Sequence, residues 1–320
     1  NEVSLLSLST GDYHDIKELI TELSHRYYRN SLTFSLPSLR LDTSTAGLID
    51  LLPPQRKITL TFAPEAGSER LRRVINKNIS EGEILGTIAA LANKGWLKIK
   101  LYFMIGLPSE TIEDIGGIVE LVGKIRRLER KIRLQISTSI LIPKAHTPCQ
   151  WLAQETEEQL LPKYEILRRG LRQEGVGFSW SNPNASQIEA ALSRGDRRLG
   201  RVIYCAWQLG CRFDAWSEQF DYQKWLDAFT QAGLHPYFYA NRERELDETL
   251  PWGHIDSGVI PEFLKKEYRK LWQGEETTDC RYGGCHACGL QRWQAGCQKK
   301  YKASMAEPNP SLPRLALKKT

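Results

Sequence analysis

The residues best suited to chemistry are four cysteines near the end of the chain, at Cys280, Cys285, Cys288 and Cys297. The Cys-x2-Cys spacing of the middle pair places two thiolates on one tight turn, which is how tetrahedral sulfur sites begin. Zinc and an iron–sulfur cluster use the same ligands, so the spacing does not choose between them. We predict a metal or cluster site within residues 273–302, against the alternative of free thiols.

The cysteine count bears on the compartment of the protein. Seven cysteines is an odd number, and the sequence shows neither a secretory signal nor an apolar run of about 20 residues that could span a bilayer. This pattern favours free or metal-bound thiols in the cytoplasm over a disulfide framework. His286 is an alternative to Cys297 as the fourth ligand, and Cys149, Cys205 and Cys211 are expected to be structural.

A second group of candidate residues follows two β-like runs. Residues 57–63 end at a turn that contains Glu65 and Ser68, and residues 97–105 end at a turn that begins with Gly106. Parallel strands carry their ligand-binding loops at their carboxyl ends, and both turns hold the Gly, Ser and Glu residues that such a site needs. Their adjacent strands are expected to bring the two turns together.

Strands and helices that alternate along the sequence must position these two turns. Ser80 and Glu83 form a capping-box pattern that starts the helix between the two runs. Further strands are predicted at 2–9, 31–36 and 131–141, and helices at 12–28, 46–51, 112–128 and 155–174. Strands that alternate with helices indicate an α/β fold with a parallel sheet or barrel. Beyond residue 178 the chain is rich in tryptophan and mostly helical.

Two motifs resemble a known family. They read Phe62-Ala63-Pro64-Glu65-Ala66-Gly67-Ser68 and Phe103-Met104-Ile105-Gly106-Leu107-Pro108-Ser109-Glu110-Thr111. They resemble the fourth and fifth strands and loops of radical S-adenosylmethionine (SAM) enzymes, in an uncharacterised branch with an N-terminal cobalamin-binding-type domain. The resemblance implies a partial parallel (β/α)6 barrel that lacks its first strand, followed by a mostly helical C-terminal region with a Cys-rich metal knuckle.

This resemblance sets the expected domains. Residues 1–178 would be the partial barrel and 179–272 the aromatic-rich helical region. Residues 273–302 would be the metal or Fe–S knuckle and 303–320 a disordered basic tail. The chain begins at Asn1 within an apolar run, so we expect it to be the later part of a longer protein.

The resemblance also implies which residues bind SAM. Ser9, Thr10, Gly11 and Asp12 fall at the turn that contacts the SAM amino group in the family. Glu65, Gly67 and Ser68 fall where the family contacts the SAM ribose or carboxylate, with Arg40 nearby. The remaining expected SAM-binding residues are Gly106, and Pro143 after the last strand. Residues 9–12 depart from the family's Gly-Gly-Glu, and a plain strand-to-helix turn capped by Asp12 is the alternative. For residues 65–68 the alternative is a capped helix start without a ligand. The Cys-x3-Cys-x2-Cys loop that holds the family's 4Fe–4S cluster is absent.

The expected function is therefore part of a radical SAM enzyme that cleaves SAM reductively and acts on an unknown substrate. The fragment alone would be inactive, so whether this chain is itself an enzyme stays open. The resemblance implies as partners the missing N-terminal part and an electron donor such as flavodoxin or ferredoxin, with cobalamin on the missing domain. The alternative is a metal-stapled module that binds RNA or protein. The net charge of +6 fits a solvated surface, and the alternative, a nucleic-acid footprint, would need a clustering of basic residues that the sequence shows only weakly.

Overall fold

The computed structural model describes residues 2–5, 10–27, 33–35, 47, 48, 51 and 59–306. Its main sheet has four parallel strands paired in sequence order. They are β3 (Leu60–Glu65), β4 (Lys98–Ile105), β5 (Arg133–Ile140) and β6 (Gly177–Trp180). A second parallel pair joins β1 (Glu2–Ser4) to β2 (Thr33–Ser35). Parallel neighbours require crossover connections, and helices supply them here.

Side-chain caps set where the crossover helices begin. Ser80 Oγ accepts from Glu83 N at 3.2 Å and Ser80 N donates to Glu83 Oε2 at 2.8 Å, so the predicted capping box is confirmed. It starts α4 (Glu81–Asn93), and Thr111 with Asp114 caps α5 (Ile112–Leu128) in the same way. The other helices of this half are α1 (Ile16–Tyr27) after the 3-10 turn η1 (Thr10–Asp12), α3 (Glu69–Val74) and α6 (Glu157–Gln173).

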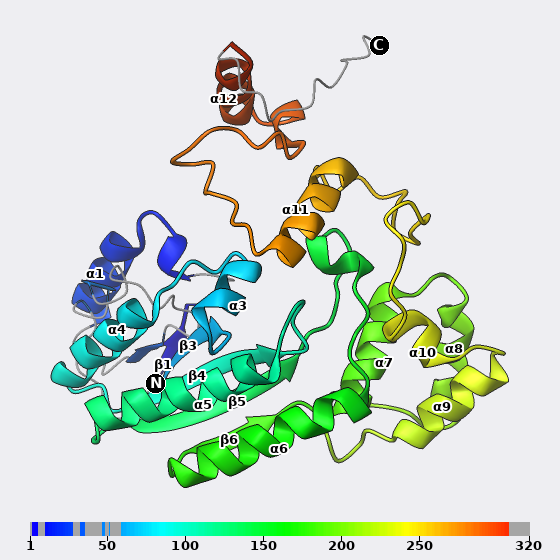
Figure 1. Cartoon of the computed structure of the whole chain (residues 1–320), viewed down its shortest axis with the longest axis horizontal. Helices are drawn as coiled ribbons and strands as arrows, with labels where there is room; N and C mark the ends of the chain where they lie inside the picture. The colour runs from blue at the N-terminus through cyan, green and yellow to red at the C-terminus, as the bar shows by residue number, and fades with distance from the viewer. Residues whose placement is uncertain are drawn as a thin grey trace.

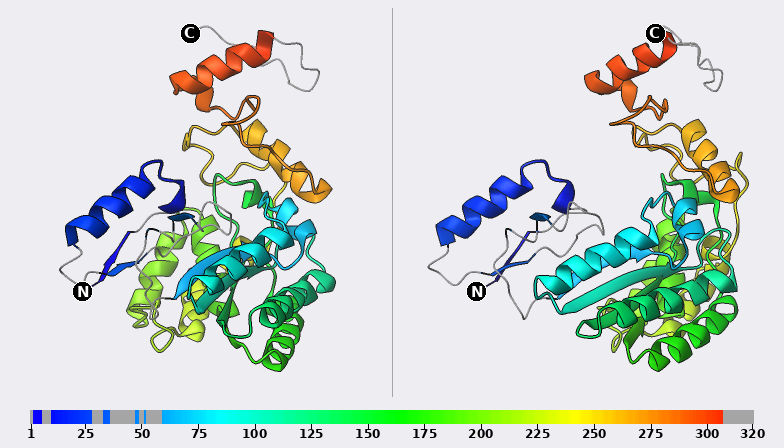
Figure 2. Two further views of the ribbon diagram at one scale, coloured as in Figure 1. Left: turned by 90° about the vertical axis from the view of Figure 1, so that its left-hand side faces the viewer. Right: turned by 60° about the vertical axis from the view of Figure 1, so that its left-hand side comes forward.

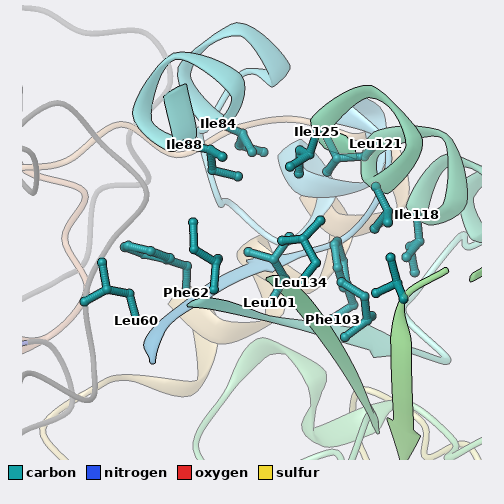
Figure 3. Close-up of a cluster of buried hydrophobic side chains, with 14 of the residues drawn as sticks. Leu60, Phe62, Ile84, Ile88, Leu101, Phe103, Ile118, Leu121, Ile125 and Leu134 are labelled. Atoms are coloured by element: carbon teal, nitrogen blue, oxygen red, sulfur yellow. The ribbon is translucent and has the colours of Figure 1, made fainter. Parts of the chain in front are cut away.

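The hydrophobic core lies between one face of the main sheet and helices α4, α5 and α6. Along β4 the buried residues alternate with half-buried ones, as a strand with one buried face requires. Figure 3 shows Phe62, Leu101 and Phe103 of the strands among Ile88 of α4 and Leu121 of α5. Figure 1 shows α5 and α6 running along the sheet. Burial of this face holds the strands in register and fixes where each one ends.

The C-terminal half packs around a second apolar cluster. Its helices are α7 (Pro183–Arg194), α8 (Leu199–Gln208), α9 (Tyr222–Gln231) and α10 (Pro236–Ala240). They are followed by α11 (Pro261–Gln273), the 3-10 turn η4 (Leu290–Arg292) and α12 (Ala295–Ala306). Figure 1 shows α7 to α10 grouped together, and both views of Figure 2 show α12 standing apart from the sheet.

The predicted α/β class with a parallel sheet is confirmed. Strand β6 was not predicted, and the expected domain boundary at residue 178 falls inside it. The strand was missed because the segment 177–180 has only four residues, most of them exposed, and lacks the apolar alternation that indicates a strand. Within the described residues, no helix combines the length and the apolar character needed to cross a membrane.

Burial along β4 gives a first prediction. Leu101 is fully buried, whereas Leu97, one residue before the strand, is 37% exposed. Leu101→Ala is expected to lower the free energy of unfolding by about 2–5 kcal/mol, because it leaves a cavity in the core. Urea unfolding followed by tryptophan fluorescence measures the loss, with Leu97→Ala as the matched control. Equal losses in the two variants would contradict the assignment of this face to the core.

Candidate functional site

The candidate residues after the strands lie at one edge of the main sheet. Strand β3 ends at Glu65, Gly106 follows β4, and Pro143 lies three residues after β5. The parallel register pairs Ile105 with Ile140, so β4 and β5 end level, and it pairs Glu65 with Phe103, so β3 ends two residues before the end of β4. We call this the carboxyl edge. Their placement together follows from the topology, while their role in binding SAM stays a prediction.

Glu65 ends its strand in an unusual backbone conformation. Its φ is 69°, and the pairing with β4 shifts register between Phe62 and Glu65. A non-glycine residue in this region marks local strain, which tends to occur where side chains are aimed for function. The carboxylate is 24% exposed and lies 3.3 Å from Lys77 Nζ. Glu65 therefore points a partly accessible carboxylate at the carboxyl edge, with a cation beside it.

Gly67 is required by packing. A Cβ built at this position would lie 2.2 Å from Ile118 N and 2.4 Å from Gly117 C. The backbone of the β3–α3 turn therefore touches the backbone of α5, and no other residue fits there. This packing contact explains why residue 67 is a glycine, without any need for a bound ligand.

Ser68 is also engaged within the protein. Its Oγ accepts from Leu71 N at 3.1 Å as the N-cap of α3 and donates to Asp114 Oδ1 at 2.5 Å. Arg70 forms an ion pair with the same carboxylate, and Thr111 N donates to it at 2.8 Å. The hydroxyl of Ser68 thus joins the first turns of α3 and α5. Its hydroxyl proton is committed to Asp114, and its contact with a ligand stays a prediction.

Asp114 links these turns through its charge. Burial alone would raise the pKa of Asp114, but hydrogen bonds from Ser68, Arg70 and Thr111 outweigh it and hold the pKa below its usual range. The ionised carboxylate is therefore the form that holds the turns together.

The sequence reasoning missed a buried ion cluster beside Gly106. Lys163 Nζ of α6 lies 2.5 Å from Glu110 Oε1 and 2.6 Å from Glu155 Oε1. Glu110 Oε1 also accepts from Gly106 N at 3.0 Å. The Glu110 and Lys163 side chains are 1% and 8% exposed. Burial raises the pKa of Glu110 even though Lys163 opposes the shift.

A sequence signal for this cluster exists. Leu160, Leu167 and Leu171 form the buried stripe of α6, and Lys163 lies on that stripe at helical spacing. A lysine on an apolar stripe needs a carboxylate partner, because a lone buried charge is costly. Glu110 fixes the backbone of Gly106, whose φ of 78° suits glycine.

A polar face on the sheet is the second feature that was missed. The residues between the core positions are polar and reach solvent: Lys100 and Tyr102 of β4, Gln135 and Ser137 of β5, and Ser179 of β6. Lys100 Nζ lies 4.5 Å from the Tyr102 ring centre, and Ser179 Oγ donates to Ser137 Oγ at 3.1 Å. This face lies opposite α4, α5 and α6, where a barrel has its interior. The alternation of apolar and polar residues in 97–105 was the available signal.

The predicted turn near the start of the chain is described in part. Ser9 and Arg40 lie outside the described residues. Thr10, Gly11 and Asp12 form the turn η1, in which Thr10 Oγ1 donates to Leu5 O at 3.1 Å. Gly11 lines a cavity of about 980 Å³. Its other lining residues include Asn76, Thr277, Thr278 and Arg281. The segment before Cys280 therefore faces this turn across the cavity.

The C-terminal region docks on the carboxyl edge. Ala66, Leu107 and Leu141, which follow β3, β4 and β5, form a third apolar cluster with Leu264 and Leu271 of α11. A cavity of about 850 Å³ opens beside it. It is lined by the turn after β5, by residues 246–256 and by α11, and includes His146, Trp151 and Trp252. A concave site with aromatic walls at this edge has the dimensions of a small-molecule pocket.

The predicted metal site is not assembled. Within the residues described, no three Cys, His, Asp or Glu side chains are placed to hold a metal ion. Each group has its own local contacts instead: Cys285 Sγ accepts from Ala287 N at 3.4 Å, Cys297 Sγ lies near Gln294, and His286 Nε2 contacts Thr278 O. Cys280 is exposed and Cys288 half-buried. The knuckle and its zinc or second cluster are therefore not confirmed, since the fourth thiol lies on α12, apart from the loop that carries the others.

Comparison with known proteins identifies the first part of the chain. Residues 1–122 match the model of the radical SAM superfamily, so this segment is a radical SAM domain. The matched segment contains β3, β4, the turns after them and most of α5, so the resemblance noted in the two motifs is confirmed.

A second comparison finds a relative whose function is not stated. An uncharacterised protein of Methanocaldococcus jannaschii is 37% identical over 203 residues, an alignment that covers 63% of this chain and 43% of the relative. The chain thus spans less than half the length of this relative. The radical SAM superfamily implies the use of SAM and an iron–sulfur cluster. The chain has no cysteine before Cys149, so the matched residues supply no thiolate for such a cluster.

The lowered pKa of Asp114 gives a second prediction. The carboxylate stabilises the fold fully above its unfolded pKa of about 3.9, and this contribution is lost as the pH falls below that value. Asp114→Asn is expected to destabilise the protein at pH 7, and its difference from wild type should shrink by pH 3. Urea unfolding at several pH values measures this, with Glu120→Gln on the same helix as control. A difference that stays constant with pH would refute the link to ionisation.

The buried ion cluster gives a third prediction. Lys163→Met removes the cation between Glu110 and Glu155 and is expected to cost about 3–5 kcal/mol of stability at pH 7. Lys124→Met is the matched control, because its pair with Glu81 is partly exposed, with side chains 41% and 33% accessible, and contributes about 1 kcal/mol or less. Adding Glu110→Gln to Lys163→Met should recover part of the loss. If the two lysine variants lose the same stability in urea unfolding, the cluster does not stabilise the edge.

Proposed function

We propose that this chain is part of a longer radical SAM enzyme and that its carboxyl edge binds SAM. The observation that carries the proposal is the family match over residues 1–122, which includes the turns after β3 and β4. Within the longer protein, an iron–sulfur cluster would supply the electron for reductive cleavage of SAM. This chain would supply the surface that binds and orients the nucleoside.

Three groups at the edge suit that role. Glu65 offers a partly exposed carboxylate that can accept hydrogen bonds from ribose hydroxyls. Gly106 has no side chain, so a flat base can approach the backbone there. Glu110 Oε1 accepts hydrogen bonds from Gly106 N and from Lys163 Nζ, so Glu110 and Lys163 together hold the Gly106 amide in place. The role proposed for these groups is to bind SAM and to hold it in position.

The substrate would enter from the polar face of the sheet. Lys100, Tyr102, Gln135 and Ser137 offer donors and acceptors there, next to the edge where SAM is proposed to bind. An electron donor such as flavodoxin or ferredoxin, cobalamin on a further domain, and a cytoplasmic location also belong to the proposal. All seven cysteines are free thiols, which suits a reducing compartment.

The test measures 5′-deoxyadenosine, the product of reductive SAM cleavage. The longer protein, reconstituted without oxygen with iron and sulfide, is expected to form it from SAM and dithionite. Glu65→Gln should weaken SAM binding about 10-fold or more, because a hydrogen bond to a charged group contributes about 1.5–3 kcal/mol. Glu129→Gln, at the far end of α5, is the control.

The same assay on this chain alone should give no product above a blank without protein, because the chain lacks the cysteine loop of the family. Turnover by the chain alone would refute the proposal that it depends on further residues. Equal SAM affinity in Glu65→Gln, Glu129→Gln and wild type would remove Glu65 from the site.

A further inference from the structure

Helix α8 has one buried face. Leu199, Val202, Cys205 and Ala206 recur at helical spacing and pack in the second apolar cluster. Trp225 and Phe229 of α9 lie in the same cluster. This contact fixes the rotation of α8 and therefore decides which side chains face solvent.

The solvent face of α8 carries aromatic rings. Tyr204 is 57% exposed and Trp207 is 53% exposed, and their ring centres are 5.9 Å apart at an angle of 33°. Phe213, just after the helix, is 75% exposed. Large rings contribute little to folding when left in water, so a group of them on one helix face indicates an interaction surface.

Arginines accompany the rings. Arg201 lies one helical turn before Tyr204, and the Arg212 guanidinium lies 6.0 Å from the Trp207 ring centre. In the described part of the chain, neither arginine forms an ion pair with a carboxylate. The aromatic–arginine face, as we call it, consists of Arg201, Tyr204, Trp207, Gln208 and Arg212.

Carboxylates are absent from this stretch of sequence. Residues 197–213 contain four arginines and neither Asp nor Glu. The flanking acids are engaged elsewhere: Asp196 binds Arg198 at 2.7 Å, and Asp214 accepts from Trp225 Nε1 at 3.2 Å. Within the described residues, neither of these acids forms an ion pair with Arg201 or Arg212.

We propose that the aromatic–arginine face binds single-stranded nucleic acid. A nucleotide presents a flat base beside a phosphate, and Trp207 with Arg212 presents a ring beside a guanidinium. Stacking on exposed rings with cations along the backbone is how proteins hold single strands. A protein partner would use the same rings, but it would not require a stretch free of carboxylates. The inference is independent of the proposed radical chemistry.

The test uses the full chain and two fluorescently labelled probes, an oligouridylate and an oligodeoxythymidylate. Fluorescence anisotropy at low salt is expected to show binding of at least one probe. Trp207→Ala should weaken it at least about 5-fold through the loss of stacking. Arg201→Gln with Arg212→Gln should reduce the slope of log affinity against log salt by about 1.4, because two phosphate contacts are lost. Tighter binding of one probe than of the other also supports the proposal and shows whether the protein distinguishes RNA from DNA.

Two controls separate binding from folding. Trp207→Phe keeps a ring for stacking and should bind within about 3-fold of wild type, since every base can stack on any aromatic face. Trp293→Ala removes another exposed tryptophan that lies 5.7 Å from an arginine, and it should leave affinity unchanged. Thermal melting by circular dichroism should show all these variants folded.

Three results would overturn the proposal. The first is no binding of either probe at low salt, where electrostatic association is strongest. The second is equal weakening by Trp207→Ala and Trp293→Ala. The third is a dimer in light scattering that Trp207→Ala abolishes, which would assign the face to a second copy of the chain.

Discussion

The contact between the backbone of Gly67 and the backbone of α5 is the constraint on which the carboxyl edge depends. No side chain fits between Gly67 and Ile118. Because the turn after β3 lies directly on α5, Ser68 and Arg70 reach Asp114 in the first turn of that helix. One close approach therefore sets the position of β3, of α3 and of the amino end of α5. It also shows that a glycine in a family motif can be required by packing alone.

Local signals in the sequence predicted the elements that local interactions determine. The Ser80–Glu83 capping box and the runs 57–63 and 97–105 are short-range patterns, and the structure has a helix or strand at each. The ends of parallel strands meet at one edge for purely topological reasons, so the grouping of Glu65, Gly106 and Pro143 was also foreseeable. Strand β6 was not, because four mostly exposed residues become a strand only through their pairing with β5.

Long-range pairings account for what the sequence did not reveal at the site. Lys163 lies 53 residues from Glu110, and no spacing rule connects them. Spacing was equally insufficient for the cysteines, since Cys-x2-Cys specifies a turn but not the position of Cys297 on α12. The polar face of the sheet is encoded in the alternation of β4, where half-buried positions regularly separate the buried ones. Arg212 likewise gains significance only when the turn after α8 brings it beside Trp207, and Arg201 only when α8 places it one turn before Tyr204.

The docking of α11 on the carboxyl edge affects how the protein is made. Leu264 and Leu271 of α11 cover Ala66, Leu107 and Leu141, which directly follow β3, β4 and β5. Even Leu141, the last of these three residues in the sequence, is synthesised long before Leu264 and Leu271. A ribosome adds about 5–20 residues per second, so roughly 7 to 26 seconds separate the synthesis of Leu141 from that of Leu271. During this interval the apolar edge is exposed on the nascent chain and open to chaperones. Completion of the edge is therefore a late event in biosynthesis, after the sheet itself has been made.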